Sequence, residues 1–160
     1  MGLLMQIPNR VYKIKPLADL PLRAPDGGRI LIICESDFDT DRLKTVFRQA
    51  GLASESADNM TAGCESARSG QFGVIFSTPL PGNGSWIRLI EVASQFSLSF
   101  EIVLLARSFD LSQWAEALQV GAFDVLDVLC DLPKAAETAR RALGAGYLKR
   151  FRPRGESAGC

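Results

Sequence analysis

Any chemistry carried out by this chain has to proceed without histidine, because the sequence contains none. That absence excludes Ser-His-Asp and Cys-His catalysis, zinc sites with histidine ligands and relays through phosphohistidine. The four cysteines stand at positions 34, 64, 130 and 160, with gaps of 30, 66 and 30 residues and no Cys-x-x-Cys pair. This spacing matches neither a metal site nor a thioredoxin-type motif, so we expect buried or incidental thiols.

An acidic cluster follows the first apolar segment and consists of Glu35, Asp37, Asp39 and Asp41. Carboxylates are hard oxygen ligands that suit Mg²⁺, which makes Glu35 and Asp37 weak candidates for metal binding. The favoured interpretation is simpler, because acidic residues at the start of a helix cap its N–H groups and complement its dipole. We therefore expect no metal site here.

The C-terminal part of the chain is basic, with six arginines and lysines and no acidic residue between positions 140 and 154. Tyr147 and Phe151 lie among these charges, and a basic-aromatic segment of this kind can contact nucleic acid or an acidic partner. Cations at the end of a helix also complement its dipole. Binding of nucleic acid is therefore the less favoured interpretation.

Composition places the chain among ordinary globular domains. It has 160 residues, 47% of them hydrophobic, and 18 basic residues balance 18 acidic ones. The longest apolar segments have five residues, at 30–34 and 102–106, whereas a membrane-spanning helix needs about 20. The first residues also lack the charged and long apolar regions of a signal peptide. We expect a cytoplasmic protein of one domain with no membrane contact.

Short apolar segments alternate with amphipathic ones, and these elements must position the residues above. Strands are predicted at 30–34, 52–57, 74–76, 101–106 and 125–128, because continuous apolar segments suit strands buried on both faces. Helices are predicted after them, with these N-caps: Asp37 or Asp39, Asn59, Ser85, Asp110 and Asp131. Strands joined by helices favour a parallel sheet, whose sites form at the carboxyl ends of its strands.

The two ends of the chain differ from its centre. Residues 1–28 contain four prolines and end in Asp-Gly-Gly, which predicts an extended arm with one short strand at 10–15. Residues 29–146 carry the regular pattern, and residues 147–160 are predicted to be a flexible basic tail. Because only 14 residues follow position 146, we expect a stand-alone domain without an output domain.

Residues 29–146 resemble the receiver domain of bacterial two-component response regulators. Four segments carry the resemblance: 29–33 is similar to the family's first strand, 74–82 to its third strand and Leu-Pro-Gly loop, 102–106 to its fourth strand, and 116–126 to the approach to its fifth. The resemblance implies a flavodoxin-like (βα)5 fold of the α/β class. That fold is a three-layer sandwich around a parallel five-stranded sheet in the order 2-1-3-4-5.

The resemblance also implies Mg²⁺-dependent transfer of a phosphoryl group from a histidine kinase to an aspartate. In this chain most of the matching positions are substituted. The acidic pair falls on Cys34 and Glu35, and the phosphoacceptor falls on Ser77. The switch threonine or serine falls on Leu105, and the lysine and the proline behind it fall on Val128 and Leu129.

These substitutions predict a degenerate receiver. Ser77 is a neutral hydroxyl that no histidine can activate, and Val128 supplies no cation for developing phosphoryl charge. We therefore expect a pseudo-receiver that is not an enzyme, needs no cofactor and acts without aspartyl phosphorylation. Its partner would be another signalling protein or a second copy of itself.

Further expectations concern the partner surface and the alternative functions. In the family, helix four, strand five and helix five form the output face, which makes Gln113, Trp114, Arg140 and Arg141 the candidate contact residues. Trp114 would anchor a partner if it is exposed, and packing of its side chain in the core is an equally favoured alternative. Leu118 is expected to face the core. One alternative is a phosphorelay receiver with a displaced acceptor at Asp37 or Asp39.

The other alternative is a small flavodoxin-like ligand-binding protein or enzyme. A flavin phosphate needs a loop rich in Ser, Thr or Gly after the first strand. Residues 34–39 are acidic instead and would repel it.

Overall fold

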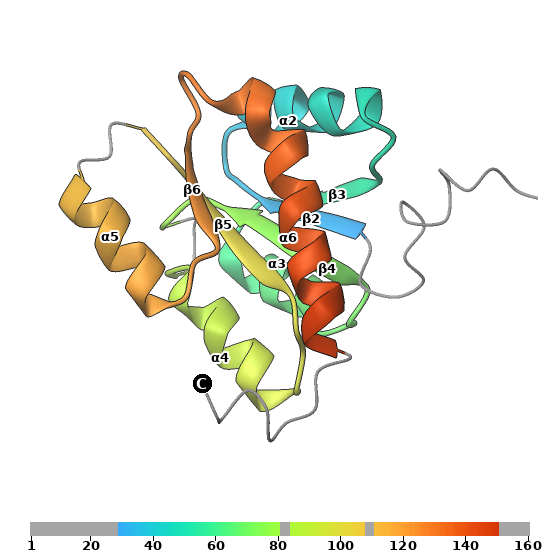
Figure 1. Cartoon of the computed structure of the whole chain (residues 1–160), viewed down its shortest axis with the longest axis vertical. Helices are drawn as coiled ribbons and strands as arrows, with labels where there is room; N and C mark the ends of the chain where they lie inside the picture. Colours follow the sequence, from blue (N-terminus) through green and yellow to red (C-terminus); the bar gives the residue numbers. More distant parts are fainter. Residues whose placement is uncertain (1–28, 81–83, 108–110, 151–160) are drawn as a thin grey trace, which may run out of the picture.

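The computed structural model describes residues 29–80, 84–107 and 111–150 (Figure 1). The predicted arm at 1–28, the N-cap Asp110 and the end of the tail lie outside the described residues. Five strands form one parallel sheet: β2 (Arg29–Ile33), β3 (Ser54–Ala57), β4 (Phe72–Ser77), β5 (Glu101–Ala106) and β6 (Asp124–Asp127). Their spatial order is β3-β2-β4-β5-β6, which confirms the predicted 2-1-3-4-5 topology.

Helices cover both faces of this sheet and produce three layers (Figure 1). On one face lie α2 (Asp37–Gln49) and α6 (Ala135–Arg150), the latter preceded by the 3₁₀ turn η1 (Leu132–Lys134). On the other lie α3 (Met60–Ala67), α4 (Ile87–Gln95) and α5 (Leu111–Val120). Within the described residues, no helix is long and apolar enough to span a membrane.

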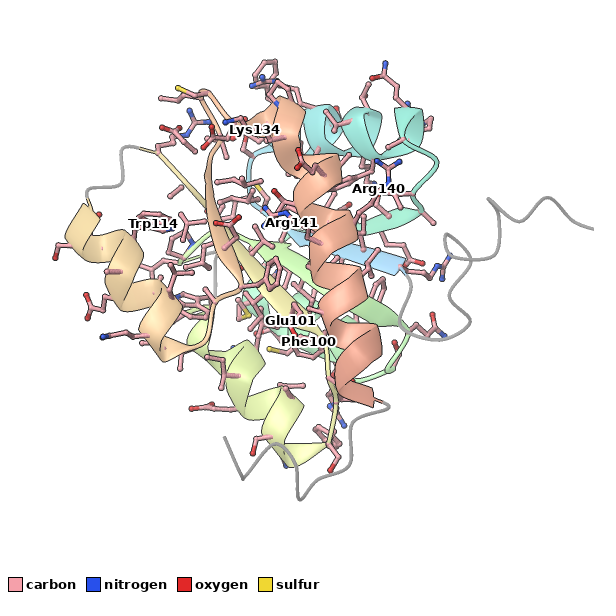
Figure 2. All side chains as sticks on the ribbon, in the orientation of Figure 1. Phe100, Glu101, Trp114, Lys134, Arg140 and Arg141 are labelled. Carbon is pink, nitrogen blue, oxygen red and sulfur yellow. The ribbon has the colours of Figure 1, made fainter. Side chains whose placement is uncertain are left out.

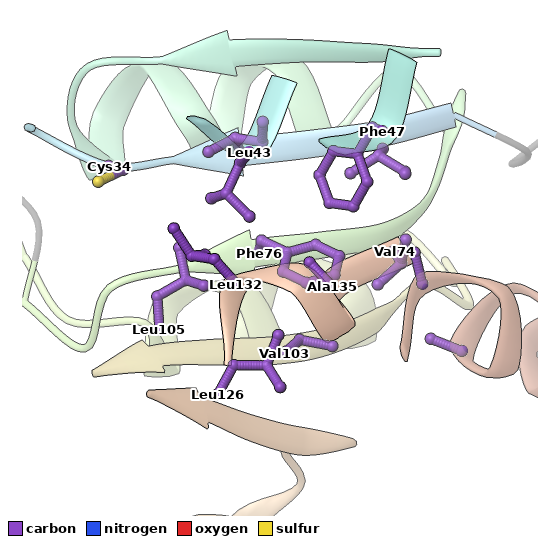
Figure 3. Packing of buried hydrophobic residues seen from close by; sticks show 14 of the residues in the cluster. Cys34, Leu43, Phe47, Val74, Phe76, Val103, Leu105, Leu126, Leu132 and Ala135 are labelled. Atoms are coloured by element: carbon purple, nitrogen blue, oxygen red, sulfur yellow. The ribbon is translucent and has the colours of Figure 1, made fainter. Parts of the chain in front are cut away.

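The central strands are buried on both sides because successive side chains of a strand point to opposite faces. Ile30 and Ile32 pack toward α2 and α6, whereas Leu31 and Ile33 pack toward α3 and α4. Figure 3 shows the first of these two clusters, in which the rings of Phe47 and Phe76 lie 5.1 Å apart at an angle of 59°. The continuous apolar segments in the sequence therefore reflect burial on two sides.

The observed N-cap residues agree in part with those predicted from the sequence. The Asn59 side chain caps α3 by accepting the Ala62 N–H at 2.8 Å, as predicted. The predicted caps Asp37 and Asp39 are wrong for α2, because Ser36 holds the extended cap conformation and its Oγ accepts the Asp39 N–H at 3.2 Å. The two aspartates lie inside the first turn, where their charge complements the helix dipole.

The last predicted cap is also wrong. Asp131 makes no side-chain cap on the helix that follows it, because η1 intervenes before α6 begins. Its carboxylate instead accepts the Asp127 N–H at 3.0 Å and closes the turn after β6. Helix start signals identify the neighbourhood of a helix, while competing local hydrogen bonds decide which residue makes the cap.

The close approach of α3 to β2 requires glycine at position 63. A Cβ at this position would lie 2.7 Å from Cγ1 of the fully buried Ile33 and closer still to its Cδ1. We expect Gly63→Ala to lower the free energy of unfolding by about 1–3 kcal/mol, although alanine is the better helix former. Urea denaturation followed by circular dichroism measures this change.

Gly144 supplies the matched control for this substitution. It lies on α6, and a Cβ there would meet no atom within 4 Å. Gly144→Ala should therefore raise the free energy of unfolding by about 0.5–1 kcal/mol. Equal effects from the two variants would contradict the close packing of α3 on β2.

Candidate functional site

The carboxyl ends of the strands meet at one edge of the sheet and gather the positions that the sequence singled out. Ser77 ends β4 and is in register with Ile33 of β2 and Leu104 of β5. Cys34 follows β2, and Val128 follows β6 with its N–H donated to the Ala106 carbonyl at 2.9 Å. Because the strands are parallel, residues far apart in the chain become neighbours here.

Ser77 is completely buried. Its hydroxyl donates a hydrogen bond of 2.7 Å to the carbonyl oxygen of the next residue, Thr78. A buried hydroxyl that is satisfied within its own segment costs little free energy. Such a hydroxyl is also a poor nucleophile, because it is neutral and its proton is held by a carbonyl rather than by a base.

The positions matching the switch hydroxyl and the lysine have become part of the hydrophobic core. Leu105 and Val128 are both buried and belong to one cluster with Leu132. Figure 3 shows Leu105 and Leu132 in this cluster. Leu129, at the position matching the family's proline, is exposed beyond the end of β6. The edge of the sheet therefore presents apolar side chains where phosphoryl chemistry would need a cation and a hydroxyl.

Cys34 replaces one carboxylate of the expected acidic pair. Its side chain is buried, and the S–H donates to the Ser36 carbonyl at 3.7 Å. Burial raises the pKa of the Cys34 thiol, so the neutral form is favoured. A protonated thiol is neither a good metal ligand nor a reactive nucleophile, which favours a structural role.

The residues at this edge do not fit a magnesium ion. Glu35 and Asp37 are exposed, and within the described parts of the chain no three Cys, Asp or Glu side chains come close enough to hold a metal. The buried carboxylate of Asp39 already has a cation, the guanidinium of Arg107, with Nη2 2.6 Å from Oδ2. We therefore derive no step through Mg²⁺.

The Asp39–Arg107 ion pair joins the start of α2 to the end of β5. The Asp39 side chain is 5% exposed and that of Arg107 is 54% exposed, so the pair closes a buried carboxylate off from solvent. Sequence reasoning did not single out Arg107. The available signal was its place directly after a predicted strand, at the edge where sites form.

A cavity of about 720 Å³ lies between the strand ends and α5. Its walls include Cys34, Leu105 and Val128 from the predicted site, together with residues that the sequence did not indicate: Trp86, Ile87, Glu116, Ala117 and Val120. Sequence patterns could not have revealed it, because its walls come from segments spread between positions 34 and 128.

Helix α5 is turned in an unexpected direction. Leu118 was expected to face the core but is 37% exposed, so that prediction is wrong, and Trp114 one turn earlier is 40% exposed. Among the described side chains of α5, only Ala117 is buried. Gln113 and Glu116 line the cavity, so the apolar pair points outward while polar side chains face the strand ends.

The candidate partner residues do not form one surface. Gln113 and Trp114 lie together on α5, and Arg141 reaches toward this side, where it pairs with Asp124 at 3.2 Å (Figure 2). Arg140 points the other way and donates to the Ala50 carbonyl at the end of α2, at 2.9 Å. Adjacent residues of a helix diverge by about 100°, so consecutive arginines serve different neighbours.

Comparison with known proteins defines the class of this fold. No protein-family model and no curated protein match the chain. Among solved structures, it is similar to the receiver domain of the Francisella response regulator 1452, with a TM-score of 0.66 and 14% identity over 73% of this chain and 97% of that one.

A signal receiver domain of a histidine kinase from Syntrophus aciditrophicus gives a TM-score of 0.63 at 22% identity, over 73% of this chain and 90% of that one. A receiver domain protein from Clostridium thermocellum gives 0.65 at 17% identity, over 75% and 97%. The fold is therefore that of a receiver domain.

The Asp39–Arg107 pair should contribute measurably to stability. A double-mutant cycle with Asp39→Asn, Arg107→Met and the double variant should give a coupling free energy of about 1 kcal/mol, limited by the exposure of the arginine. Urea denaturation at low and high salt measures it, and the coupling should weaken as salt increases. A coupling of zero at low salt would show that the two side chains do not interact.

Proposed function

We propose that residues 29–146 form a receiver-like signalling domain that works in the cytoplasm through protein–protein interaction and without aspartyl phosphorylation. The observation that carries this proposal is the buried Ser77, whose hydroxyl is bound to the Thr78 carbonyl at the position of the phosphoacceptor. The proposed activity is binding, with no catalytic step and no cofactor.

Three losses act together in support of the proposal. A phosphoryl acceptor needs an anionic oxygen, a neighbouring cation and a hydroxyl that follows the transferred group. Here those positions hold Ser77, Val128 and Leu105, and the last two are buried among apolar side chains. Restoring one group would leave the other two missing.

The ion pair of Asp39 with Arg107 bears on the displaced-acceptor alternative. Asp39 is nearly buried and bound to a guanidinium, which makes its carboxylate a poor acceptor. Asp37 is exposed and would be the acceptor that this alternative requires. The two functions therefore differ in whether Asp37 is phosphorylated: the displaced-acceptor alternative requires it, and the interaction domain does not.

The proposed contact surface is the outer face of α5, which carries Trp114 and Leu118. A ten-residue helix gains little from its own propensity and is stabilised mainly by packing, and α5 has one buried side chain among those described. Exposed tryptophan is enriched among residues that anchor partners. Gln113 lies on the same helix but faces the cavity, and we exclude Arg140 from the contact surface because of its contact with α2.

Solved structures of the same fold illustrate two kinds of partner, a second copy of the same domain and another signalling protein. One is a dimer of the beryllofluoride-activated NtrC4 receiver domain, with a TM-score of 0.66. Another is the complex of the yeast phosphotransfer protein Ypd1 with the receiver domain of Ssk1, with a TM-score of 0.55. For this chain we propose the same two classes, a second copy or another signalling protein.

Incubation with acetyl phosphate and Mg²⁺ tests phosphorylation independence. We expect the intact mass of the protein to stay unchanged, because the acceptor position offers only a neutral buried hydroxyl. An active receiver domain in the same reaction is the positive control. A stable phosphoryl adduct that disappears in Ser77→Ala overturns the proposal, and a labile one that disappears in Asp37→Asn establishes the displaced acceptor.

Sedimentation velocity over a range of concentrations, with pull-downs using the chain as bait, tests the contact surface. Trp114→Ala should weaken self-association or partner capture by about tenfold or more, since truncation of a central tryptophan commonly costs over 1 kcal/mol. Phe38→Ala is the matched control, because Phe38 is an exposed aromatic on α2. A chain that stays monomeric and captures nothing would contradict the proposal.

A further inference from the structure

The cavity between the strand ends and α5 has the size of a small-molecule site. Its volume of about 720 Å³ falls within the roughly 300–1,000 Å³ typical of ligand pockets. It lies at the carboxyl edge of the sheet, where ligands bind in open parallel α/β folds. The outer, partner-facing side of α5 is a different surface.

The floor of the cavity is apolar and fixed in position. Leu104, Leu105 and Val128 come from the ends of β5 and β6, and Trp86 closes one side in front of α4. All four side chains are buried, and each belongs to one of the two core clusters. A floor that is packed into the core is preorganised, so a ligand would lose little free energy in ordering it.

Charge around the cavity disfavours anions. Among the described residues, its charged lining consists of the carboxylates Glu35, Asp39 and Glu116 and one guanidinium, Arg107. That guanidinium lies 2.6 Å from the Asp39 carboxylate, so its positive charge is largely compensated. A phosphate or carboxylate entering here would meet two further negative charges, from Glu35 and Glu116.

We propose that this cavity binds a small apolar molecule that is uncharged or positively charged, such as an aromatic amine, and rejects phosphates and other anions. The apolar body of the ligand lies on Leu105 and Val128, and its polar or cationic end faces Glu116. Leu105 and Val128, at the positions that match the family's switch hydroxyl and lysine, form part of this apolar floor. This inference does not rest on the protein-interaction proposal, because a ligand can occupy the cavity whether or not α5 binds a partner.

Two fluorescent probes with one scaffold test the inference: the neutral N-phenyl-1-naphthylamine and its anionic relative 8-anilinonaphthalene-1-sulfonate. The neutral probe should bind the full chain saturably, one molecule per chain. The sulfonate should bind at least about tenfold more weakly at low salt. In Glu116→Gln this difference should shrink, because one of the repelling charges is gone.

Tryptophan fluorescence gives a second, independent signal of probe binding. The chain has two tryptophans, Trp86 in the cavity wall and Trp114 on the outer face of α5. In a Trp114→Phe background the remaining emission comes from Trp86, and bound probe should quench it by energy transfer. Saturation of that quenching should follow the same binding curve as the probe signal.

A matched pair of variants on α5 separates its inner face from its outer face. Val120 lines the cavity and Leu118 does not, although both are exposed aliphatic residues of the same helix. Val120→Asp should weaken binding of the neutral probe by about tenfold or more, and Leu118→Asp should change it less than about twofold. Circular dichroism of both variants checks that α5 and the fold persist.

Several outcomes would overturn the inference. These are the absence of saturable binding by the neutral probe, equal or tighter binding of the sulfonate, and equal effects of the two aspartate variants. Loss of binding in Leu118→Asp alone would place the probe on the outer face of α5. Collapse of α5 onto the strand ends, which would fill the cavity, would appear as no quenching of Trp86.

Discussion

The structure depends on the burial of β2, β4 and β5 on both faces of the sheet. Backbone N–H and C=O groups that lose water must be paired, and the parallel ladder pairs them along most of these strands. That requirement aligns the strands and brings all their carboxyl ends to one edge. Cys34, Ser77, Leu105 and Val128 lie together for this reason, and any site of the molecule is built on the same frame.

At that edge, three buried polar groups are satisfied inside the protein. The Ser77 hydroxyl binds the next carbonyl, the Cys34 thiol binds the Ser36 carbonyl, and Asp39 is neutralised by Arg107. A phosphorylation site would need the opposite arrangement, with charges kept available for a metal and a phosphoryl group. The free energy of burial therefore stabilises these three groups in positions where they are not available for a metal or a phosphoryl group.

Helix α5 contributes to both the proposed contact surface and the proposed ligand cavity, through two different faces. Its outer face carries Trp114 and Leu118, while its inner face places Gln113, Glu116 and Val120 against the cavity. Because Ala117 is its one buried side chain among those described, few core contacts hold this helix in place. A molecule bound on either face would add contacts to it, so occupancy of the cavity can be coupled to binding at the outer face.

The sequence by itself determined the class of fold and the order of the strands. Continuous apolar segments such as 30–34 report burial on two faces, and the serine at position 77 is visible without coordinates. Only the tertiary structure decided the Asp39–Arg107 pair, the divergence of Arg140 from Arg141, the outward direction of Leu118 and the cavity beside it. Periodicity reports local burial, whereas these features depend on distances between segments that are remote in sequence and on the rotation of a helix about its axis.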